Sequence, residues 1–384
     1  MILAGISTSC TSRAAETMHS EPVDVTDTLV AKAPADTVNE AAASSLSDST
    51  SDSQSDRKAK GGTLSLAFVG DIMPGTTFPE SRLPERDGAT LFIDVDSILT
   101  AADVAAGNME GALADDGETT KKGGKYSYSF RVPTRYGKLI ADAGFDFMSM
   151  ANNHAFDFGL DGIKSTEATL QANGIAYSGI GGRTESAVVE RNGVRYGFCA
   201  FGHNSYTLKH ADLDNVKRII SDLREKADIV IVSFHGGAEG TAHTHLPQGK
   251  EMFLGENRGD LRTFTHFCID NGADVVYGHG PHVVRAVELY KGHFIAYSLG
   301  NFCTPYGVNI SGISGYAPVL QLNINAEDGT FVDGKIHSFI QQRGKGPRRD
   351  KQNLVAKEIK SLTNADFSNP KLNIAADGTI TKKQ

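Results

Sequence analysis

Hydrophobic runs of strand length alternate with helix-like patterns from about residue 64 onward. These runs are short and hydrophobic, as expected of buried strands, and several of them end in glycine or a turn. The predicted strands are residues 64–70, 102–107, 145–150, 194–201, 228–234, 273–277 and 293–298.

Between these runs, apolar residues recur at helical spacing, and several of the segments are ended by glycine. The predicted helices are residues 134–144, 162–174, 214–227 and 258–272. Because strands alternate with helices, the pattern predicts an α/β layered fold. Residues 317–340 alternate apolar and polar positions about "EDGT". This segment predicts a β-hairpin that closes one edge of the sheet.

The two ends of the chain differ from the rest in composition and in hydrophobic pattern. Residues 11–60 contain no aromatic residue and are rich in Ala, Ser, Thr, Asp and Glu, so they predict a disordered linker, either a membrane tether or a plain tail. "MILAGISTSC", residues 1–10, resembles the end of a lipoprotein signal that reaches Cys10. Either a fuller signal lies upstream or the likeness is accidental. Residues 343–384 predict a C-terminal extension with a weak strand pair or a frayed tail.

Composition narrows the class of partner. The formal net charge is −8 and no long basic block occurs, which argues against nucleic acid or anionic lipid as the main partner. No run reaches the 18 apolar residues of a membrane-spanning helix, so any attachment to a membrane would be through lipid. Four cysteines, widely spaced, are too few for a disulfide framework or a thiolate zinc site. A small molecule or a metal ion fits the composition better.

Polar residues with acid, amide or imidazole groups follow several predicted strands. They are Asp71, then Asn108 and Glu110, then Asn153, His154 and Asp157, then His235 and Glu239, then His279 and His282, and finally Asn301. In open α/β sheets, ligands bind beyond the carboxyl ends of the strands, so these side chains should converge there. Mixed carboxylate, amide and imidazole ligands suit Zn, Mn or Fe, whereas Mg and Ca prefer oxygen ligands alone.

Each residue also has a structural interpretation. Asp71 could cap a helix, Asn153 could hold a left-handed turn, and His235 could be a hydrogen-bonded core histidine. Asp157 could cap a turn instead of orienting His154. His203, His210 and His266 are interpreted as structural or surface residues, whereas His243 and His245 could be a further ligand pair or could meet substrate. The coincidence of many such residues favours the metal site.

The motifs "GDIMPG", "GNMEG", "NNHAFDFG", "FHGGAEG" and "GHGPHVVRAVELYKGHFIAYSLGNF" follow one another in this order. Together they resemble the CapA family of bacterial poly-gamma-glutamate capsule biosynthesis proteins, over about residues 64–340. The resemblance implies a four-layer α-β-β-α sandwich of the calcineurin-like metallophosphoesterase type, within a domain expected at residues 61–342. It also implies an extracytoplasmic, membrane-associated role in capsule or cell-envelope polymer synthesis, in which the protein makes or anchors polyglutamate.

The resemblance also implies roles for individual residues. The expected metal ligands are Asp71, Glu110, Asn153, His235, His279 and His282, with Asn108 as the alternative to Glu110. His154 is expected to be the catalytic histidine, near the metal but not bound to it, with Asp157 orienting it. The residues expected to contact substrate are Asn108, Glu239, His245, Arg285 and Asn301.

Two departures from the family pattern leave two functions open. Met73 stands where the first motif has a histidine, and Gly280 replaces the middle histidine of the closing motif. An intact site favours a metal-dependent hydrolase of phosphoesters or of an amide-linked polymer. A weakened site favours a non-catalytic subunit of a membrane capsule-synthesis complex that binds polyglutamate. The basic residues that could meet such a polyanion are Lys121, Lys122, Lys125, Arg131 and Arg285.

Overall fold

The computed structural model describes residues 62–123 and 128–383. The predicted signal segment, the predicted linker and Lys125 lie outside the described residues. Within the described part of the chain, no helix is both long enough and apolar enough to cross a membrane.

Two mixed sheets form the centre of the fold. The larger has the order β20-β21-β17-β16-β1-β2-β5-β6, with β15 paired to β1 beside this path. Its strands are β1 (Thr63–Ile72), β2 (Val104–Met109), β5 (Phe147–Ser149), β6 (Ala176–Ser178), β15 (Asn301–Cys303), β16 (Val319–Asn325), β17 (Phe331–His337), β20 (Leu372–Ile374) and β21 (Thr379–Lys382).

The second sheet has the order β13-β14-β12-β9-β8-β7. Its strands are β7 (Ser186–Arg191), β8 (Val194–Phe201), β9 (Ile229–His235), β12 (Val275–His279), β13 (Val287–Tyr290) and β14 (His293–Ala296). Strands β8, β9, β12 and β14 run parallel to one another, so their carboxyl ends lie at one edge, whereas the outer strands β7 and β13 are antiparallel to them.

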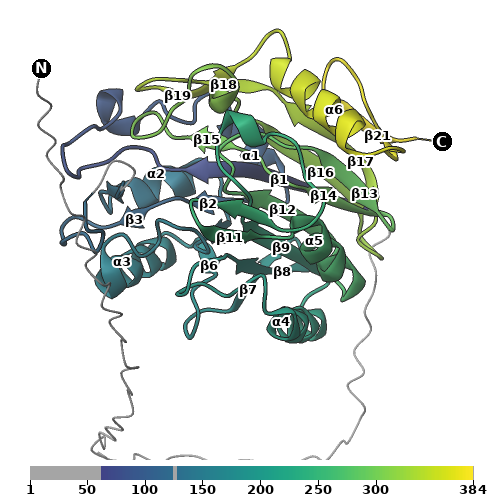
Figure 1. Cartoon of the computed structure of the whole chain (residues 1–384), viewed down its shortest axis with the longest axis horizontal. Coiled ribbons are helices and arrows are strands. Elements are labelled where there is room, and N and C mark those ends of the chain that lie inside the picture. Colours follow the sequence, from purple (N-terminus) through teal and green to yellow (C-terminus); the bar gives the residue numbers. More distant parts are fainter. Residues whose placement is uncertain (1–61, 124–127, 384) are drawn as a thin grey trace, which may run out of the picture. The chain divides into compact units, whose positions relative to one another are not determined.

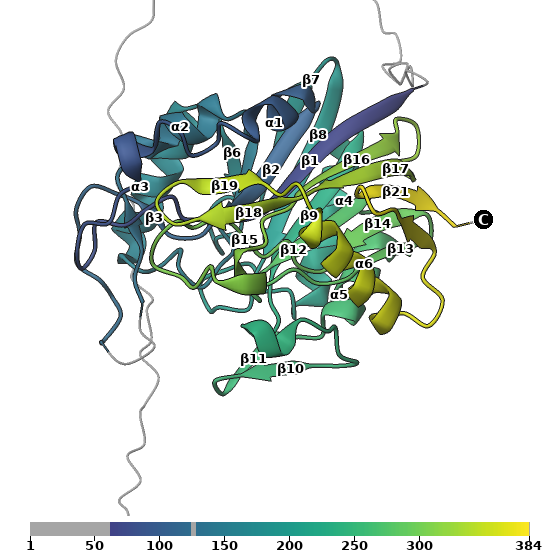
Figure 2. The same cartoon turned by 90° about the horizontal axis from the view of Figure 1, so that it is seen from above.

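Three short strand pairs and six helices complete the described part of the chain. The pairs are β3 (Ala112–Leu113) with β4 (Arg131–Val132), β10 (Glu251–Phe253) with β11 (Glu256–Gly259), and β18 (Phe339–Gln342) with β19 (Gly346–Arg349). The helices are α1 (Asp96–Ala101), α2 (Tyr136–Asp142), α3 (Gly159–Ala172), α4 (Leu213–Lys226), α5 (Leu261–Asp270) and α6 (Leu354–Asp366). The β10–β11 hairpin projects beyond the two sheets (Figure 2).

Alternation along the strands builds the layers. On β1, Leu66 and Phe68 belong to a core shared with the second sheet, whereas Ala67 and Val69 belong to a core shared with α1, α2 and α3. Aromatic stacking joins the sheets, with Phe68 over Tyr277 at 4.6 Å between ring centroids. A third core lies between the second sheet and helices α4 and α5, which cover its outer face (Figure 1). The four-layer α-β-β-α sandwich is therefore confirmed.

The predicted strands and helices are all present, with bounds that differ by a few residues. The predicted hairpin is present as β16 and β17, but the expectation that it closes the sheet is wrong, because β21 pairs with β17 and carries β20 to the edge. The predicted C-terminal extension contains the strand pair that the sequence offered as one of two alternatives. It supplies β20, β21 and α6, and α6 buries Val355 and Ile359 in the core between the sheets.

Candidate metal centre at the strand ends

Strand register brings the predicted residues together. On parallel strands β9 and β12, His235 is the direct partner of His279. On the larger sheet, β1 pairs in parallel with both β2 and β15, so Asp71 has Asn108 on one side and Asn301 on the other. Since the two sheets pack face to face just before these positions, the carboxyl ends of both sheets share one crevice.

Asp71, His235 and His279 form a cluster, here called the metal cluster, in which one ligand atom from each residue lies within 4.8 Å of the others. All three residues are fully buried. Neither ring nitrogen of His235 has a hydrogen-bond partner among the described residues. His279 Nε2 pairs with Ser233 Oγ at 2.9 Å, and its Nδ1 is unpartnered. Burial lowers the pKa of His279 to about 4, so the imidazole is neutral and able to bind a metal.

The carboxylate of Asp71 is held by two neighbours. Asn108 Nδ2 donates to Asp71 Oδ1 at 2.8 Å, and His282 Nδ1 lies 2.9 Å from Asp71 Oδ2. Asn301 Oδ1 lies 3.1 Å from the same His282 nitrogen. Burial opposes the charged form of His282, but the hydrogen bond to Asp71 and the charges of nearby carboxylates outweigh it and raise the pKa of His282 to about 10. A bound cation would compete with that proton for Asp71.

Glu110 lies on the same side of the crevice. Its Oε2 accepts a hydrogen bond from Asn108 and lies 3.7 Å from His235 Nδ1, and its buried Oε1 has no partner in the described residues. Burial, reinforced by the charge of Asp71, raises the pKa of Glu110. Four of the six expected metal ligands thus present unpartnered buried atoms, which are oxygen atoms in Glu110 and Asn153 and nitrogen atoms in His235 and His279. A buried polar atom without a partner is costly, so this donor set fits a divalent metal ion.

Asn153 and its neighbours follow β5. Asn153 does not hold a left-handed turn, because its φ is not positive. Its Oδ1 is one of the unpartnered buried atoms. Likewise, Asp71 caps no described helix, and His235 is buried without hydrogen bonds. The structural interpretations of these three residues are therefore wrong.

His154 and Asp157, here called the dyad, lie beside the metal cluster. His154 Nδ1 is 2.8 Å from Asp157 Oδ2, which also accepts a hydrogen bond from the Phe130 backbone N–H at 2.8 Å. The side chain of Asp157 is fully buried. Asp157 thus both orients His154 and secures a loop. Burial lowers the pKa of His154, although the Asp157 carboxylate opposes the shift.

Three residues expected to contact substrate are placed differently from one another. Glu239 lies at the rim, with its Oε2 4.0 Å from His282 Nε2. His245 lies away from the crevice, because its exposed ring pairs with Asp366 Oδ1 at 2.7 Å near the end of α6. Arg285 is fully buried in a two-armed ion pair with Glu251, at 2.8 Å for each arm. Arg285 is therefore not a surface cation for a polyanion, and that expectation is corrected.

The two departures from the family pattern have structural reasons. Met73 is fully buried among apolar residues and is not part of the metal cluster. Gly280 has a φ of 119°, and a Cβ there would lie 2.7 Å from the backbone oxygen of Gly236. The tight approach of these two loops therefore requires glycine, because a side chain at 280 would clash.

Sequence reasoning missed two polar residues of the crevice. Asn152 is fully buried and donates to Asn108 Oδ1 at 3.0 Å and to the Met109 carbonyl at 2.7 Å. Its own Oδ1 accepts from the His154 backbone N–H. His203, interpreted as structural or surface, lies beside His235 with ring centroids 5.9 Å apart. The double asparagine of "NNH" could have indicated Asn152. The place of His203 could be known only from the structure, in which β8 pairs with β9 and brings His203 beside His235.

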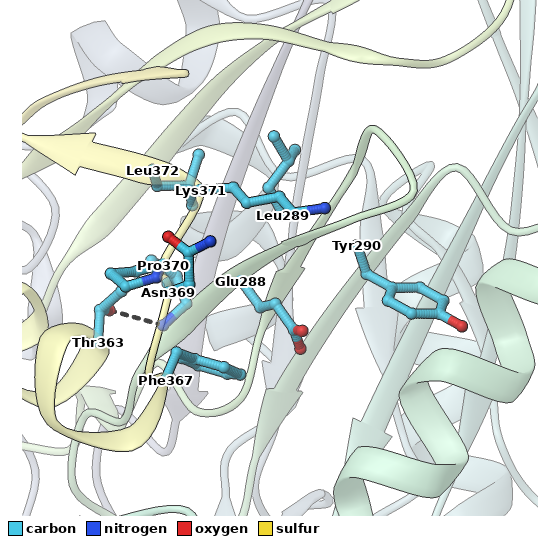
Figure 3. Close-up of a pocket in the computed structure, with 10 residues that line it drawn as sticks. Glu288, Leu289, Tyr290, Thr363, Phe367, Asn369, Pro370, Lys371 and Leu372 are labelled. Atoms are coloured by element: carbon cyan, nitrogen blue, oxygen red, sulfur yellow. Dashed lines mark hydrogen bonds between the residues drawn. The ribbon is translucent and has the colours of Figure 1, made fainter. Parts of the chain in front are cut away.

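A separate pocket lies between β13 and the segment that joins α6 to β20. It measures about 90 Å³ and is lined by residues that include Glu288, Lys371 and Phe367 (Figure 3). The hydrogen bond from the Val287 N–H to Thr363 Oγ1 closes its wall at 3.0 Å. None of the crevice residues lines this pocket.

The layers and the site define a class: a four-layer sandwich with a candidate metal centre at the carboxyl ends of its strands. The chain belongs to the family described as bacterial capsule synthesis protein PGA_cap, which matches residues 65–306. It is 30% identical over 259 residues to the PGA biosynthesis protein CapA of Bacillus subtilis, which covers 64% of each chain. It is 29% identical over 264 residues to the capsule biosynthesis protein CapA of Bacillus anthracis, covering 64% of this chain and 60% of that protein.

The chain thus spans less than two thirds of the length of these two relatives. Among solved structures, a phosphatase from Mycoplasma pneumoniae aligns over 73% of this chain and 94% of its own, with 12% identity and a TM-score of 0.46.

Proposed function

We propose that this chain is a metal-dependent hydrolase that acts on phosphoesters or on an anionic polymer such as polyglutamate, in capsule or cell-envelope polymer metabolism. The observation that carries the proposal is His235, which is fully buried beside Asp71 and His279 with neither ring nitrogen hydrogen-bonded. An imidazole in this state is stabilised by a bound Zn, Mn or Fe ion. The family relationship supports the polymer context.

Asp71, His235 and His279 would hold the ion, and Glu110 and Asn153 offer further oxygen atoms to it. The bound ion would supply Lewis-acid chemistry at the bond to be broken. Asn108 fixes the carboxylate of Asp71. The Nδ1–H of His154 points to Asp157, so a proton given to a leaving group would come from the Nε2–H of the doubly protonated ring.

The metal content of the purified chain tests the first half of the proposal. We expect elemental analysis to find about one transition-metal ion per wild-type chain and less than about a tenth of that in His235→Ala, because the variant loses a ligand. His266→Ala is the matched control, since His266 pairs with Glu288 away from the crevice. No metal above background in the wild type would overturn the proposal.

Hydrolysis of a generic phosphodiester tests the second half. We expect His154→Ala to lower kcat by about 10²- to 10⁴-fold, the usual contribution of a general acid, while the metal content stays at the wild-type level. A variant that keeps both metal and rate would contradict the role of His154.

A second candidate is a non-catalytic subunit that binds or guides polyglutamate. Met73 favours it, because this side chain lies in an apolar core at the position where the family pattern has a further metal ligand. In that case the wild-type chain binds its metal and polyglutamate, measured by calorimetry, but hydrolyses neither the polymer nor the phosphodiester.

We also propose an extracytoplasmic location, with lipid attached through Cys10 and contact with a membrane capsule-synthesis complex. The likeness of residues 1–10 to a lipoprotein signal and the family relationship support this. Labelled palmitate should be incorporated into the full chain in its native host and not into Cys10→Ala. Equal labelling of both chains, or labelling of neither, would count against attachment through Cys10.

A further inference from the structure

Lys121 lies where sequence reasoning placed a surface cation, but its ammonium group points to the dyad. Its Nζ is 2.5 Å from Asp157 Oδ1 and 3.2 Å from His154 Nδ1, and it donates to the Tyr128 carbonyl at 2.7 Å. The Lys121 side chain is 29% exposed, so most of it is withdrawn from solvent.

The backbone around Lys121 is fixed to the same segment. The Thr120 N–H donates to the Asp157 carbonyl at 2.9 Å, and Thr120 Oγ1 donates to the Phe156 carbonyl at 2.9 Å. The loop that carries Lys121 is therefore attached to the dyad through both main chain and side chain. A lysine that only collected an anionic polymer would not need these contacts.

The charges and hydrogen bonds of Asp157 give Lys121 a role. Asp157 Oδ2 is shared by His154 Nδ1 and the Phe130 N–H, whereas buried Oδ1 has no hydrogen bond and only the Lys121 ammonium beside it. A carboxylate accepts but cannot donate, so the hydrogen bond to Oδ2 requires a proton on His154 Nδ1. Without Lys121, the buried Oδ1 of Asp157 would have no compensating charge beside it, which favours rotation of the carboxylate away from His154.

We propose that Lys121 is a positioning residue, which holds the Asp157 carboxylate so that the Nδ1–H of His154 stays directed at Asp157 and its Nε2 stays directed at the substrate. The inference deepens the proposed function, and its kinetic test rests on that function. Its spectroscopic test is independent of whether the protein is a hydrolase.

The spectroscopic test observes the Nδ1 proton of His154 directly. In full-length protein labelled with ¹⁵N-histidine, we expect a ring N–H resonance that is absent in His154→Ala and in Asp157→Ala. It should persist in Lys122→Ala, the exposed neighbour, and disappear in Lys121→Met. Thermal unfolding checks that each variant is folded. If the resonance is unchanged in folded Lys121→Met, the proposal is overturned, whether or not the protein is a hydrolase.

The kinetic test asks whether Lys121 acts through Asp157. We expect Lys121→Met to lower kcat by about 10-fold with KM changed less than about twofold, and Lys121→Arg to recover part of the rate. In an Asp157→Asn background, Lys121→Met should have less than about a twofold further effect, because residues in one network are not additive. Additive losses, or a rise in KM alone, would mean that Lys121 meets the substrate itself and would overturn the proposal.

A wild-type chain that hydrolyses nothing contradicts the proposed function but leaves the resonance of His154 to decide on Lys121. The two failures are therefore distinguishable.

Discussion

The metal cluster and the dyad lie in one crevice but differ in how their polar atoms are satisfied. In the metal cluster, His235 has no hydrogen bond and His279 has one unpartnered nitrogen. In the dyad, His154 Nδ1 is engaged by Asp157, and Asp157 is itself held by Phe130 and Lys121. The metal cluster therefore has ring nitrogens without a hydrogen-bond partner among the described residues, whereas the groups that orient His154 contact one another there.

The difference separates two tasks that similar residues perform. Imidazole and carboxylate groups occur in both regions, so residue type alone does not assign the role. Unpartnered nitrogen and oxygen atoms that converge on one place can receive a cation, because a bound ion would offset the free-energy cost of burying them. A histidine whose Nδ1 is hydrogen-bonded to a buried carboxylate is instead held in one orientation, as a proton donor requires.

The largest difference between the metal cluster and the dyad is expected when the carboxylate is removed from each of them in turn. Asp71→Ala should lose bound metal to below about a tenth of the wild-type content and lower hydrolysis by more than about 10³-fold, because a ligand is lost. Asp157→Ala should keep its metal and lose about 10²-fold in kcat. Elemental analysis and phosphodiester kinetics check both. Equal metal loss in the two variants would remove the distinction.

The side of the crevice that carries Glu239 also depends on a buried ion pair. Glu251→Gln leaves the Arg285 guanidinium fully buried without its carboxylate. We expect the free energy of unfolding to fall by about 3–5 kcal/mol, measured by urea denaturation. Lys138→Ala, which breaks an exposed pair with Asp142, is the control and should change stability far less. Similar losses in both variants would show that burial does not decide the strength of the pair.

The stability of the metal-free protein should depend on pH in two ways, because some buried histidines are neutral and another is charged. Burial, with a smaller contribution from the charge of His203, lowers the pKa of His210 to about 4. Between pH 6.5 and 4 the unfolded chain therefore binds a proton at this residue that the folded chain does not, and stability falls as the pH falls, by up to about 3 kcal/mol.

The contribution of His282 to the free energy of unfolding depends on pH in the opposite direction. Since its folded pKa is about 10, its contribution is fully present below pH 6.5 and is lost as the pH rises towards 10. Urea denaturation of metal-free wild type and His210→Gln across this range checks both directions. The variant should lose less stability in acid and the same amount in base. If the variant loses as much stability as the wild type between pH 6.5 and 4, the loss in acid is not due to His210.

The smallest effect concerns the turn that carries His279 and His282. Gly280→Ala should lower the free energy of unfolding by about 1–3 kcal/mol, because of its positive φ and the approach of Gly236. Gly182→Ala, at a φ of 69° with no atom within 4 Å, measures the backbone cost without the clash. If thermal unfolding shows equal losses of stability in the two variants, the approach of Gly236 to position 280 contributes nothing to the loss in Gly280→Ala.

Sequence reasoning predicted the layered fold because strand and helix periodicities are local properties of the chain. The order of the outer strands was not predictable, since β20 and β21 are short and their place beside β17 depends on a pairing far along the sequence. For the same reason α6 was missed. Its apolar residues are buried only because the two sheets leave a place for them.

The sequence by itself determined which chemical groups stand near the strand ends. Each of Asp71, His154, His235 and His279 comes shortly after a hydrophobic run that predicts a strand. Tertiary structure decided which of them meet. Asp71 and His282 are 211 positions apart and are joined by sheet packing and strand register. It also withdrew Arg285 into an ion pair and directed Lys121 to Asp157. Such contacts depend on the three-dimensional path of loops, and local sequence patterns do not specify that path.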